Sequence, residues 1–458
     1  MPYESGNTYE TAQRLGHVPI IENELVQEEL DGFSTKEVDP DEAPIEDNSY
    51  ALEDLPNEGI DPSYFLSIDG SLQEVPTNDD YPSNRIGFVQ IAAVLTKLDL
   101  LDEQESERFV DPARVEEIDD SSLQDIVLPS SNYIRDDAET TVESWRKHIY
   151  DTFKTREIEG RALLEIYLDV IQADPRLIDE NTVDVYRCPN PDCPANTGER
   201  RSELHIHTSV DDFGHCPKCD TEVYPTDALR THERVSESQS NRTAISDIMQ
   251  VFEHLTMCAY LLYLSEENPE RLSRVGFIID GPLAIYGTGS FLHKPILQTI
   301  ARVSNRQKEL GYAPPIIVGI EKSGQLKDHA DQIRDKMEPG TVLKMDNEYI
   351  YKYVKTGTTD DEYGVREHYG WPFIYRTRSG RVFMLKVPKL PNGEEKYDPM
   401  NYPLMRTTLE SISKVETALY DDATIPVTLA HQRASIPLKT GSKVLELFSK
   451  GALNNGSS

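Results

Sequence analysis

The sequence predicts an α/β protein in which a mixed sheet is flanked by helices. Residues 64–68 and 275–279 are apolar runs that each lead into Asp-Gly, and short apolar runs bounded by turn residues are typical of buried strands. Residues 85–95 form a further apolar run, and the strand-turn-strand order predicts that it lies antiparallel to the first. Apolar side chains recur at helical spacing over residues 139–173, as one long or two abutting helices, and over residues 243–262.

Length and composition divide the chain into four segments. At 458 residues the chain exceeds one typical domain. From Glu22 to Glu58 Lys36 is the only base, so this acidic segment buries too little apolar area to offset its ordering entropy. Residues 101–137 are expected to be an acidic, loop-rich connection. The expected organisation is an acidic, partly disordered N-terminal arm (1–60), the first part of the main domain (61–185), a small insertion (186–225) and the second part of the main domain (226–458).

The chain is strongly acidic, with a formal net charge of −35 at pH 7. Such a charge opposes nonspecific binding to nucleic acid or to an anionic membrane, and it favours docking on a basic protein. No apolar run is long enough to cross a bilayer, and the first residues lack the basic and apolar regions of a signal peptide. We therefore expect a soluble, cytoplasmic protein that has no membrane partner.

Two aspartates at expected strand ends indicate a metal site. Asp69 and Asp280 each close an apolar run and each precede a glycine. A carboxylate in that position is costly to bury unless a cation meets it, and hard oxygen ligands suit Mg²⁺ or Mn²⁺. The alternative is that each Asp-Gly is a turn capped by its aspartate. Lys322 follows a third expected strand, either to meet a phosphate or as a solvated strand-end lysine.

Four of the five cysteines lie in one short window and predict a zinc ribbon. Cys188 and Cys193 form one pair, and Cys216 and Cys219 form a tighter one. Four thiolates at this spacing match a closed, tetrahedral and structural Zn²⁺ site better than a disulfide scaffold. The ribbon is not clearly basic, so contact with a protein is as plausible as contact with DNA. Cys258 stands apart in an apolar helix and is expected to be a small core residue.

Residues 373–387 predict a β-hairpin with its turn at Ser379 and Gly380. This hairpin would carry the most basic surface of an acidic chain and is the best local candidate for a contact with a DNA backbone. The alternative is an ordinary charged face of a hairpin. The basic side chains that it is expected to bring together are Arg376, Arg378, Arg381 and Lys386.

Two more side chains are open to a functional or a structural interpretation. Glu253 lies in the middle of the helix at residues 243–262, where the ordinary role of a glutamate is to face solvent. His431 lies on the expected start of a late helix, and a single histidine is more often structural than catalytic.

The order of these motifs resembles the NurA nuclease family. The sequence has an Asp-Gly-Ser strand, a helix glutamate before a second Asp-Gly-x-Leu strand, a strand-end lysine and a late Pro…Leu-Ala-His…Ala-x-Ile segment. The resemblance covers residues 61–185 and 226–450, which would form the nuclease domain. It implies a ribonuclease H-like fold, a Mn²⁺- or Mg²⁺-dependent DNA nuclease and a homodimer. It also implies a HerA-type hexameric ATPase as partner, in DNA end processing or in defence against phage.

The resemblance also implies roles for individual residues. By position, Asp69 and Asp280 correspond to the two metal aspartates, and His431 corresponds to the histidine of the Ala-His pair. Glu253 is our choice for the helix glutamate, and Lys322 would stabilise phosphate charge. In hydrolysis, two divalent ions stabilise the attacking and leaving oxygens, and bridging carboxylates hold them.

Other positions remain open within the resemblance. The family often has a tyrosine before the proline of the last motif, where this chain has Ile425. The zinc ribbon is extra to the family pattern. Tyr420 or Tyr402 are possible replacements for that tyrosine, and the alternatives to the chosen glutamate are Glu266, Glu267 and Glu270.

Two rival functions fit the same residues. One is a scaffold that has lost catalysis and binds the ATPase and DNA. The other is a ribonuclease H-like enzyme that acts on RNA or on a DNA–RNA hybrid, because substrate choice depends on groove contacts that the sequence does not reveal. For the enzyme, the acidic arm is expected to dock on basic patches of the translocase ring.

Overall fold

The computed structural model describes residues 17–33, 42–78, 81, 83–98, 119–174, 178–179, 182–196, 206–209, 213–355, 357, 362–390, 395–417, 424–436 and 440–454. The chain divides into two compact units, Met1–Ala43 and Pro44–Ser458. None of the helices in the described ranges has both the length and the apolar character that a membrane crossing requires.

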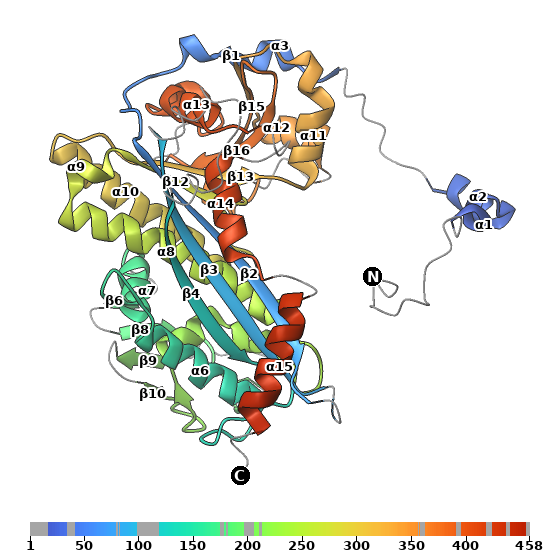
Figure 1. Cartoon of the computed structure of the whole chain (residues 1–458), viewed down its shortest axis with the longest axis vertical. Helices are drawn as coiled ribbons and strands as arrows, with labels where there is room; N and C mark the ends of the chain where they lie inside the picture. The colour runs from blue at the N-terminus through green and yellow to red at the C-terminus, as the bar shows by residue number, and fades with distance from the viewer. Residues whose placement is uncertain are drawn as a thin grey trace. The chain divides into compact units, whose positions relative to one another are not determined.

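A nine-stranded mixed sheet organises the larger unit (Figure 1). In spatial order its strands are β1 (Ser49–Ala51), β14 (Thr341–Lys344), β15 (Gly370–Arg376), β16 (Val382–Pro388), β13 (Ile316–Glu321), β12 (Val275–Asp280), β2 (Tyr64–Pro76), β3 (Arg85–Lys97) and β4 (Asp119–Pro129). Strand β12 pairs in parallel with β2 and with β13, whereas the other pairings described in this sheet are antiparallel. The expected α/β fold with a mixed sheet flanked by helices is confirmed.

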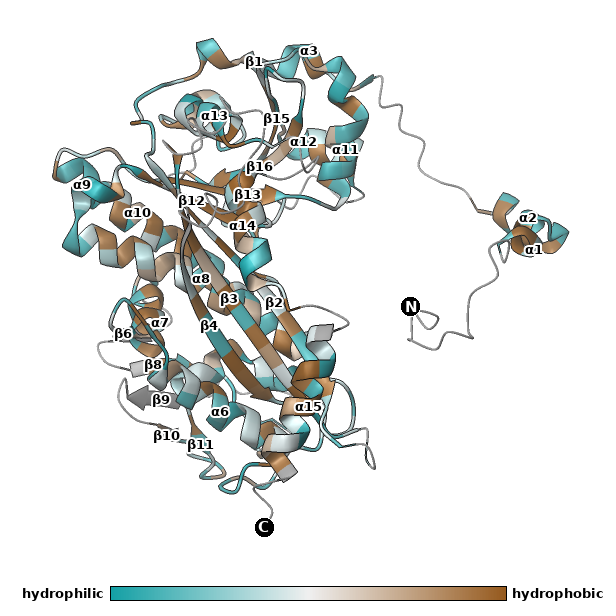
Figure 2. Ribbon diagram, in the orientation of Figure 1, coloured by the Kyte–Doolittle hydropathy of each residue, from teal (hydrophilic) through white to brown (hydrophobic). Residues whose placement is uncertain are grey.

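Helices cover both faces of the sheet because the side chains of β2 and β3 alternate between two cores. Ile68 and Ile91 face one core, where they pack with α6 (Thr141–Thr155), α7 (Leu163–Ile171) and α8 (Arg242–Glu267). Ala92 and Val94 face the other side, where they pack against α14 (Ile425–Ala434). In Figure 1, α14 and α15 (Thr440–Asn454) follow one another along β2, and apolar residues colour the strands brown in Figure 2.

Further helices complete the larger unit. Helix α10 (His293–Glu309) connects β12 to β13 and packs against α8. The remaining α-helices are α3 (Ile45–Asn48), α9 (Pro269–Leu272), α11 (Gln325–Ile333), α12 (Asn347–Tyr349) and α13 (Met405–Lys414). Residues 44–60 of the predicted acidic arm also belong to this unit, where β1 pairs with β14.

One local expectation needs correction, and one open alternative is decided. Residues 119–129 were expected within a loop-rich connection, but they form the edge strand β4, which pairs with β3 over its length. Ile126 and Leu128 of this strand are buried, while Leu123 and Val127 on the opposite face are exposed. The acidic residues of β4 are tolerated because an edge strand has a solvent side. The helical region at 139–173 is two helices, separated by the short hairpin of β5 (Glu157–Ile158) and β6 (Arg161–Ala162).

The insertion contributes to two small sheets, one of which it shares with the strands that precede it. Strands β7 (Ile178–Asp179), β8 (Thr182–Val185) and β9 (Ile206–Ser209) form one, and β10 (Gly214–His215) and β11 (Glu222–Val223) form a second. Short antiparallel strands suffice here, because the end of the segment packs against α6 through Glu222 and Tyr224 rather than building a large core of its own.

In the smaller unit, α1 (Val18–Ile21) and α2 (Glu24–Asp31) are the described elements. Asn23 caps α2, because its side chain accepts a hydrogen bond from the Leu25 backbone N–H. Neither helix has a buried residue.

Candidate active site and a four-cysteine cluster

Asp69 lies inside a long strand rather than at its end. Strand β2 runs on to Pro76 in a hairpin with β3, so the predicted strand end at Gly70 is wrong. The parallel pairing with β12, however, reaches only to Ile68. Asp69 is therefore the first residue of β2 beyond this parallel pairing. There its carboxylate is buried, and Oδ1 accepts a hydrogen bond of 2.9 Å from the Gly70 N–H.

Asp280 and Lys322 do lie at strand ends, as predicted. Asp280 is the last residue of β12, and Lys322 follows the last residue of β13. Because the two strands are parallel, their carboxyl ends meet at one edge of the sheet. The Lys322 Nζ lies 2.7 Å from Asp280 Oδ2. This charged hydrogen bond holds the Lys322 ammonium against Asp280.

His431 reaches the two aspartates from helix α14. Its Nδ1 lies 2.8 Å from Asp69 Oδ2 and 4.0 Å from Asp280 Oδ2. Ligand atoms of Asp69, Asp280 and His431 all lie within 4.8 Å of one another. The imidazole is 63% exposed, so the group is open to solvent on this side.

Ser71 positions α14, a role that we did not predict. Its hydroxyl donates a hydrogen bond to the Ala434 carbonyl and accepts one of 3.2 Å from the Ile436 N–H. The end of α14 is thereby fixed to β2, two residues from Asp69. The signal was present in the sequence, because Ser71 is the serine of the Asp-Gly-Ser motif.

Glu253 approaches from the opposite face, on α8. A Cβ added to Gly70 would lie 2.5 Å from Glu253 Oε1, so the missing side chain at Gly70 makes room for this carboxylate. Burial, and then the negative charges of Asp69 and Asp280, raise the pKa of Glu253 to about 8. The alternatives do not compete, since all three side chains are exposed near the C-terminal end of α8 or beyond it: Glu266, Glu267 and Glu270.

The electrostatics of the site favour a cation. Burial and the charge of Asp280 raise the pKa of Asp69, although His431 acts in the opposite direction. Carboxylates that lie this close together repel one another when they are ionised, and a bound cation would offset that repulsion. Carboxylate oxygens with one imidazole form a donor set that fits Mn²⁺ or Mg²⁺.

Neither suggested tyrosine is placed at this site by the described residues. Tyr402 is buried, packs edge-on against Phe373 and donates a hydrogen bond to the Lys396 carbonyl. Tyr420 lies outside the described residues.

The basic hairpin forms with the predicted turn, but its cations do not share one surface. The structure places Lys386 in the interior, with 0% exposure, where its Nζ lies 3.1 Å from Glu321 Oε2. Both faces of β16 are covered, since every residue from Val382 to Val387 is buried, so neither side of the strand offers Lys386 a way to solvent. The three arginines contact separate partners. Arg376 donates to the Met337 carbonyl, Arg378 pairs with Glu53 and Arg381 donates to the Thr417 carbonyl.

The four cysteines of the insertion converge as predicted. Cys188 Sγ lies 3.5 Å from Cys219 Sγ, and Cys193 Sγ lies 3.8 Å from Cys216 Sγ. Sulfurs about 2.3 Å from a central ion are about 3.8 Å apart in a tetrahedron, so the cluster has the size of a Zn²⁺ site. Tight turns build it, with the Cys193 N–H bonded to the Asn190 carbonyl. Burial raises the pKa of the Cys188 thiol.

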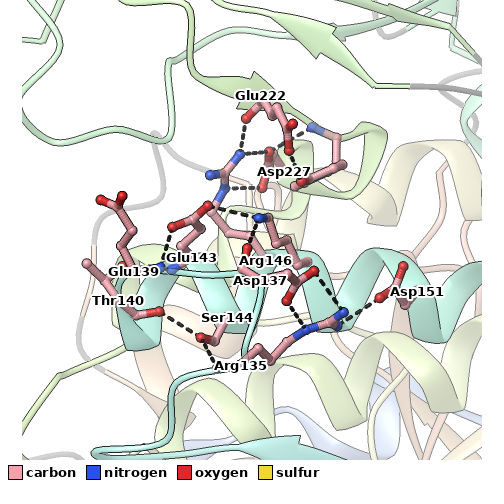
Figure 3. Close-up of polar contacts among 12 residues, drawn as sticks. Arg135, Asp137, Glu139, Thr140, Glu143, Ser144, Arg146, Asp151, Glu222 and Asp227 are labelled. Atoms are coloured by element: carbon pink, nitrogen blue, oxygen red, sulfur yellow. Dashed lines mark hydrogen bonds and ion pairs between the residues drawn. The ribbon is translucent and has the colours of Figure 1, made fainter.

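A buried ion pair fixes the four-cysteine cluster to helix α6 (Figure 3). Arg146 Nε and Nη2 donate to the two carboxylate oxygens of Asp227 at 2.9 and 2.7 Å. The same guanidinium donates to the Glu222 carbonyl and lies over the Tyr224 ring. Asp227 Oδ2 also accepts from the Tyr224 N–H. The segment that follows Cys219 is thus tied to the main core by one buried arginine.

The comparisons with known proteins are sparse. No protein-family model matches the chain, and no curated protein matches it. Among solved structures, a NurA nuclease from Sulfolobus solfataricus is similar at 9% identity and a TM-score of 0.38, covering 97% of this chain and 98% of that one. A structure described as NurA is similar at 11% identity and a TM-score of 0.29, covering 97% and 96%.

Proposed function

We propose that this protein is a divalent-metal-dependent DNA nuclease of the NurA type with a ribonuclease H-like domain. The observation that supports the proposal is the convergence of Asp69, Asp280 and His431, with Glu253 behind Gly70 and Lys322 on Asp280. A cluster of carboxylates beside one histidine and one lysine, open to solvent on one side, suits hydrolysis of a phosphodiester.

The residues have distinct roles in the proposed reaction. Asp69, Asp280 and Glu253 would hold Mn²⁺ or Mg²⁺, with His431 as a further ligand or as the base. When bound, these ions polarise the phosphate and activate water. His431 Nδ1 faces Asp69, so its Nε2 is the atom that would accept a proton from water. The Lys322 ammonium, held by Asp280, would face the developing negative charge on the phosphate.

We further propose that the four-cysteine cluster holds one structural Zn²⁺. Its closed sulfur set leaves no position for substrate, unlike the open group around His431. Its role would be to stabilise the insertion, which has little core of its own.

The partners follow from the charge of the chain. Because a net charge of −35 opposes binding to a phosphate backbone, a HerA-type hexameric ATPase would deliver DNA to a homodimer of this protein in the cytoplasm. The acidic arm would dock on basic patches of the ring. DNA end processing and defence against phage are both compatible with this arrangement. Arg376, Arg378 and Arg381 remain our candidates for backbone contacts, whereas Lys386 is too deeply buried to serve.

Cleavage assays with Mn²⁺ test the nuclease. Wild-type protein should cut linear DNA, and Asp69→Asn and Asp280→Asn should each lower the rate at least a hundredfold while leaving the fold intact. Asp125→Asn is the matched control, because Asp125 is an exposed aspartate on β4, two strands from Asp69, and pairs with Gln90 rather than with a residue of the site. Equal cleavage by Asp69→Asn and wild type would refute the site. Absence of any cleavage would favour the scaffold, and preference for RNA or a hybrid would favour the ribonuclease.

A second assay tests the partner. The purified protein and a HerA-type ATPase from the same source should co-elute in size-exclusion chromatography, and ATP should strongly accelerate DNA degradation. Deleting residues 1–43, the smaller unit, should weaken the complex in a salt-sensitive way and leave the main sheet intact. The delivery model fails if the isolated protein degrades DNA as fast as the mixture at physiological salt.

A further inference from the structure

A polar cavity of about 540 Å³ opens where the chain leaves strands β12 and β13. Tyr286, six residues beyond Asp280, lines it together with Glu321, the last residue of β13. The other side is formed by residues 351–355 and 362–368, which include Tyr363 and His368. Glu321 directly precedes Lys322, so the cavity and the candidate active site both lie at the carboxyl end of β13.

A buried lysine fixes the polar groups of this cavity. Lys386 Nζ lies 3.1 Å from Glu321 Oε2, 3.0 Å from His368 Nδ1 and 3.3 Å from the Tyr363 hydroxyl. Because an ammonium only donates, His368 Nδ1 must accept, and the proton of the neutral imidazole is on Nε2. Burial and the charge of Lys386 lower the pKa of His368 to about 2, which keeps the ring neutral. The His368 Nε2 faces the Tyr286 hydroxyl at 3.5 Å, longer than an ordinary hydrogen bond, so a ligand could replace this weak contact. The cavity therefore presents an N–H donor beside a fixed carboxylate acceptor.

Aromatic rings surround this donor and acceptor. The His368 ring lies between Tyr286 and Tyr363, with centroid distances of 5.6 and 5.1 Å. Tyr363 and His368 are buried, so they are wall residues of a preformed site, whereas Tyr286 is 43% exposed at its mouth. Tyr351 adds another ring to the lining.

The charges of the lining argue against a simple ion as the ligand. Glu321, Glu362 and Glu367 face Lys355 and Arg366 around the cavity, and Lys386 lies behind it. These acidic and basic groups nearly cancel, so neither a free phosphate nor a metal cation is strongly favoured. A flat, neutral ring with donors and acceptors on its edge matches aromatic walls, one N–H and one carboxylate.

We propose that this cavity binds an unstacked nucleobase of a DNA single strand whose backbone runs past Lys322 into the candidate active site. The inference rests on the proposed nuclease function, which it deepens by adding a base-binding subsite. Tyr286 stacks on the base, and Glu321 and the His368 Nε2–H bond to its edge. Lys355 and Arg366, both exposed, face the backbone at the rim. A volume of this size holds one nucleotide.

Binding measurements in a non-cleaving background test the subsite. The protein carries Asp69→Asn, EDTA is present, and a labelled single-stranded oligonucleotide is compared with the same strand bearing abasic sites in its last three nucleotides. Tyr286→Ala should weaken binding of the normal strand by about fivefold to a hundredfold, the scale of one lost base–aromatic stack. It should leave binding of the abasic strand unchanged. Tyr286→Phe should retain the affinity, because the ring is kept.

The matched control is Tyr186→Ala, since Tyr186 is also 43% exposed but lines a different cavity. The subsite is overturned if Tyr286→Ala binds the normal strand like the parent protein, or if it loses equal affinity for both strands. It is also overturned if a free deoxynucleoside monophosphate binds in a Tyr286-dependent way while the strand does not. If Tyr286-dependent strand binding persists in a protein whose wild-type form cuts no DNA, the subsite stands and the proposed nuclease function falls.

Discussion

The four-cysteine cluster and the acidic group around Asp69 are both candidate metal centres, yet they are built in opposite ways. All four cysteines lie within residues 188–219, on two tight turns. Asp69 and His431 are 362 positions apart, and they meet only because α14 packs on β2. The first centre is a product of local chain geometry, and the second is a product of sheet topology.

The two centres also differ in how they face solvent. Three of the four cysteines are buried, and all four sulfurs lie within 4.8 Å of one another. In the acidic group, His431 is 63% exposed and leaves one side open. A closed site suits a structural ion and an open one suits substrate. The centre that is built from one short segment is closed and stabilises that segment. The centre that is assembled from separate elements has one side open for substrate.

The strongest test of this contrast is to open the closed centre. Cys219→Ser should release zinc and locally unfold the insertion, because binding a structural zinc contributes on the order of 10 kcal/mol to folding. Elemental analysis should find one zinc per chain in the wild type and none in the variant, and hydrogen exchange should rise over residues 186–225. Cys258→Ala, at the fifth cysteine, should keep its zinc. Equal zinc content in the wild type and Cys219→Ser would show that the four cysteines do not hold a structural zinc.

The next test asks whether the buried Arg146–Asp227 ion pair anchors the insertion to the main core. Arg146→Met leaves Asp227 buried without its partner and should lower the free energy of unfolding by about 3–5 kcal/mol in denaturant titrations. Arg135→Met is the control, because Arg135 makes its pairs with Asp137 and Asp151 at the surface (Figure 3) and should cost less than about 1 kcal/mol. Similar losses for both variants would show that the buried pair does not anchor the insertion.

A pH titration tests the crowding of charge at the open centre. The pKa of Glu253 is raised to about 8 in the folded protein by burial and by Asp69 and Asp280. A raised carboxyl pKa stabilises the fold fully below the unfolded value of 4.5, and that stability is lost as pH rises towards 8. In EDTA, unfolding should therefore become easier by a few kcal/mol over this range. Glu253→Gln should flatten the profile, and added Mn²⁺ should restore stability at high pH. An unchanged profile in Glu253→Gln would contradict the assignment.

The last test concerns the space beside Gly70 that the Glu253 carboxylate occupies. Gly70→Ala should cost about 1–3 kcal/mol by overpacking and should also displace the Glu253 carboxylate, lowering cleavage about tenfold or more. Gly87→Ala is the matched control. Its Cβ would meet Ile245 on the same helix at 2.6 Å, close to the 2.5 Å at Gly70, but away from the site. Unfolding and cleavage rates measured on both variants should show similar destabilisation and a cleavage defect only in Gly70→Ala. Equal cleavage by the two would mean that Gly70 serves packing alone.

The sequence by itself determined the parts that depend on neighbouring residues. The cysteine cluster, the ends of β12 at Asp280 and of β13 just before Lys322, and the hairpin turn at Gly380 all follow from short-range spacing and turn chemistry. The edge strand β4 was missed because its polar residues lower its strand signal, and pairing with β3 overrides that weak preference.

Tertiary structure decided everything that depends on register between distant segments. The parallel pairing of β2 with β12 stops just before Asp69, whereas β2 itself continues in its hairpin with β3. This happens because β12 is shorter than the hairpin strands, and the sequence around Asp69 does not show how long a neighbouring strand is. Glu253 enters the site only through the space at Gly70, and Ser71 fixes α14 so that His431 reaches Asp69. From its charge alone Lys386 is expected at the surface, but its neighbours in the folded protein bury it completely. Burial is set by three-dimensional neighbours, which spacing along the chain cannot specify.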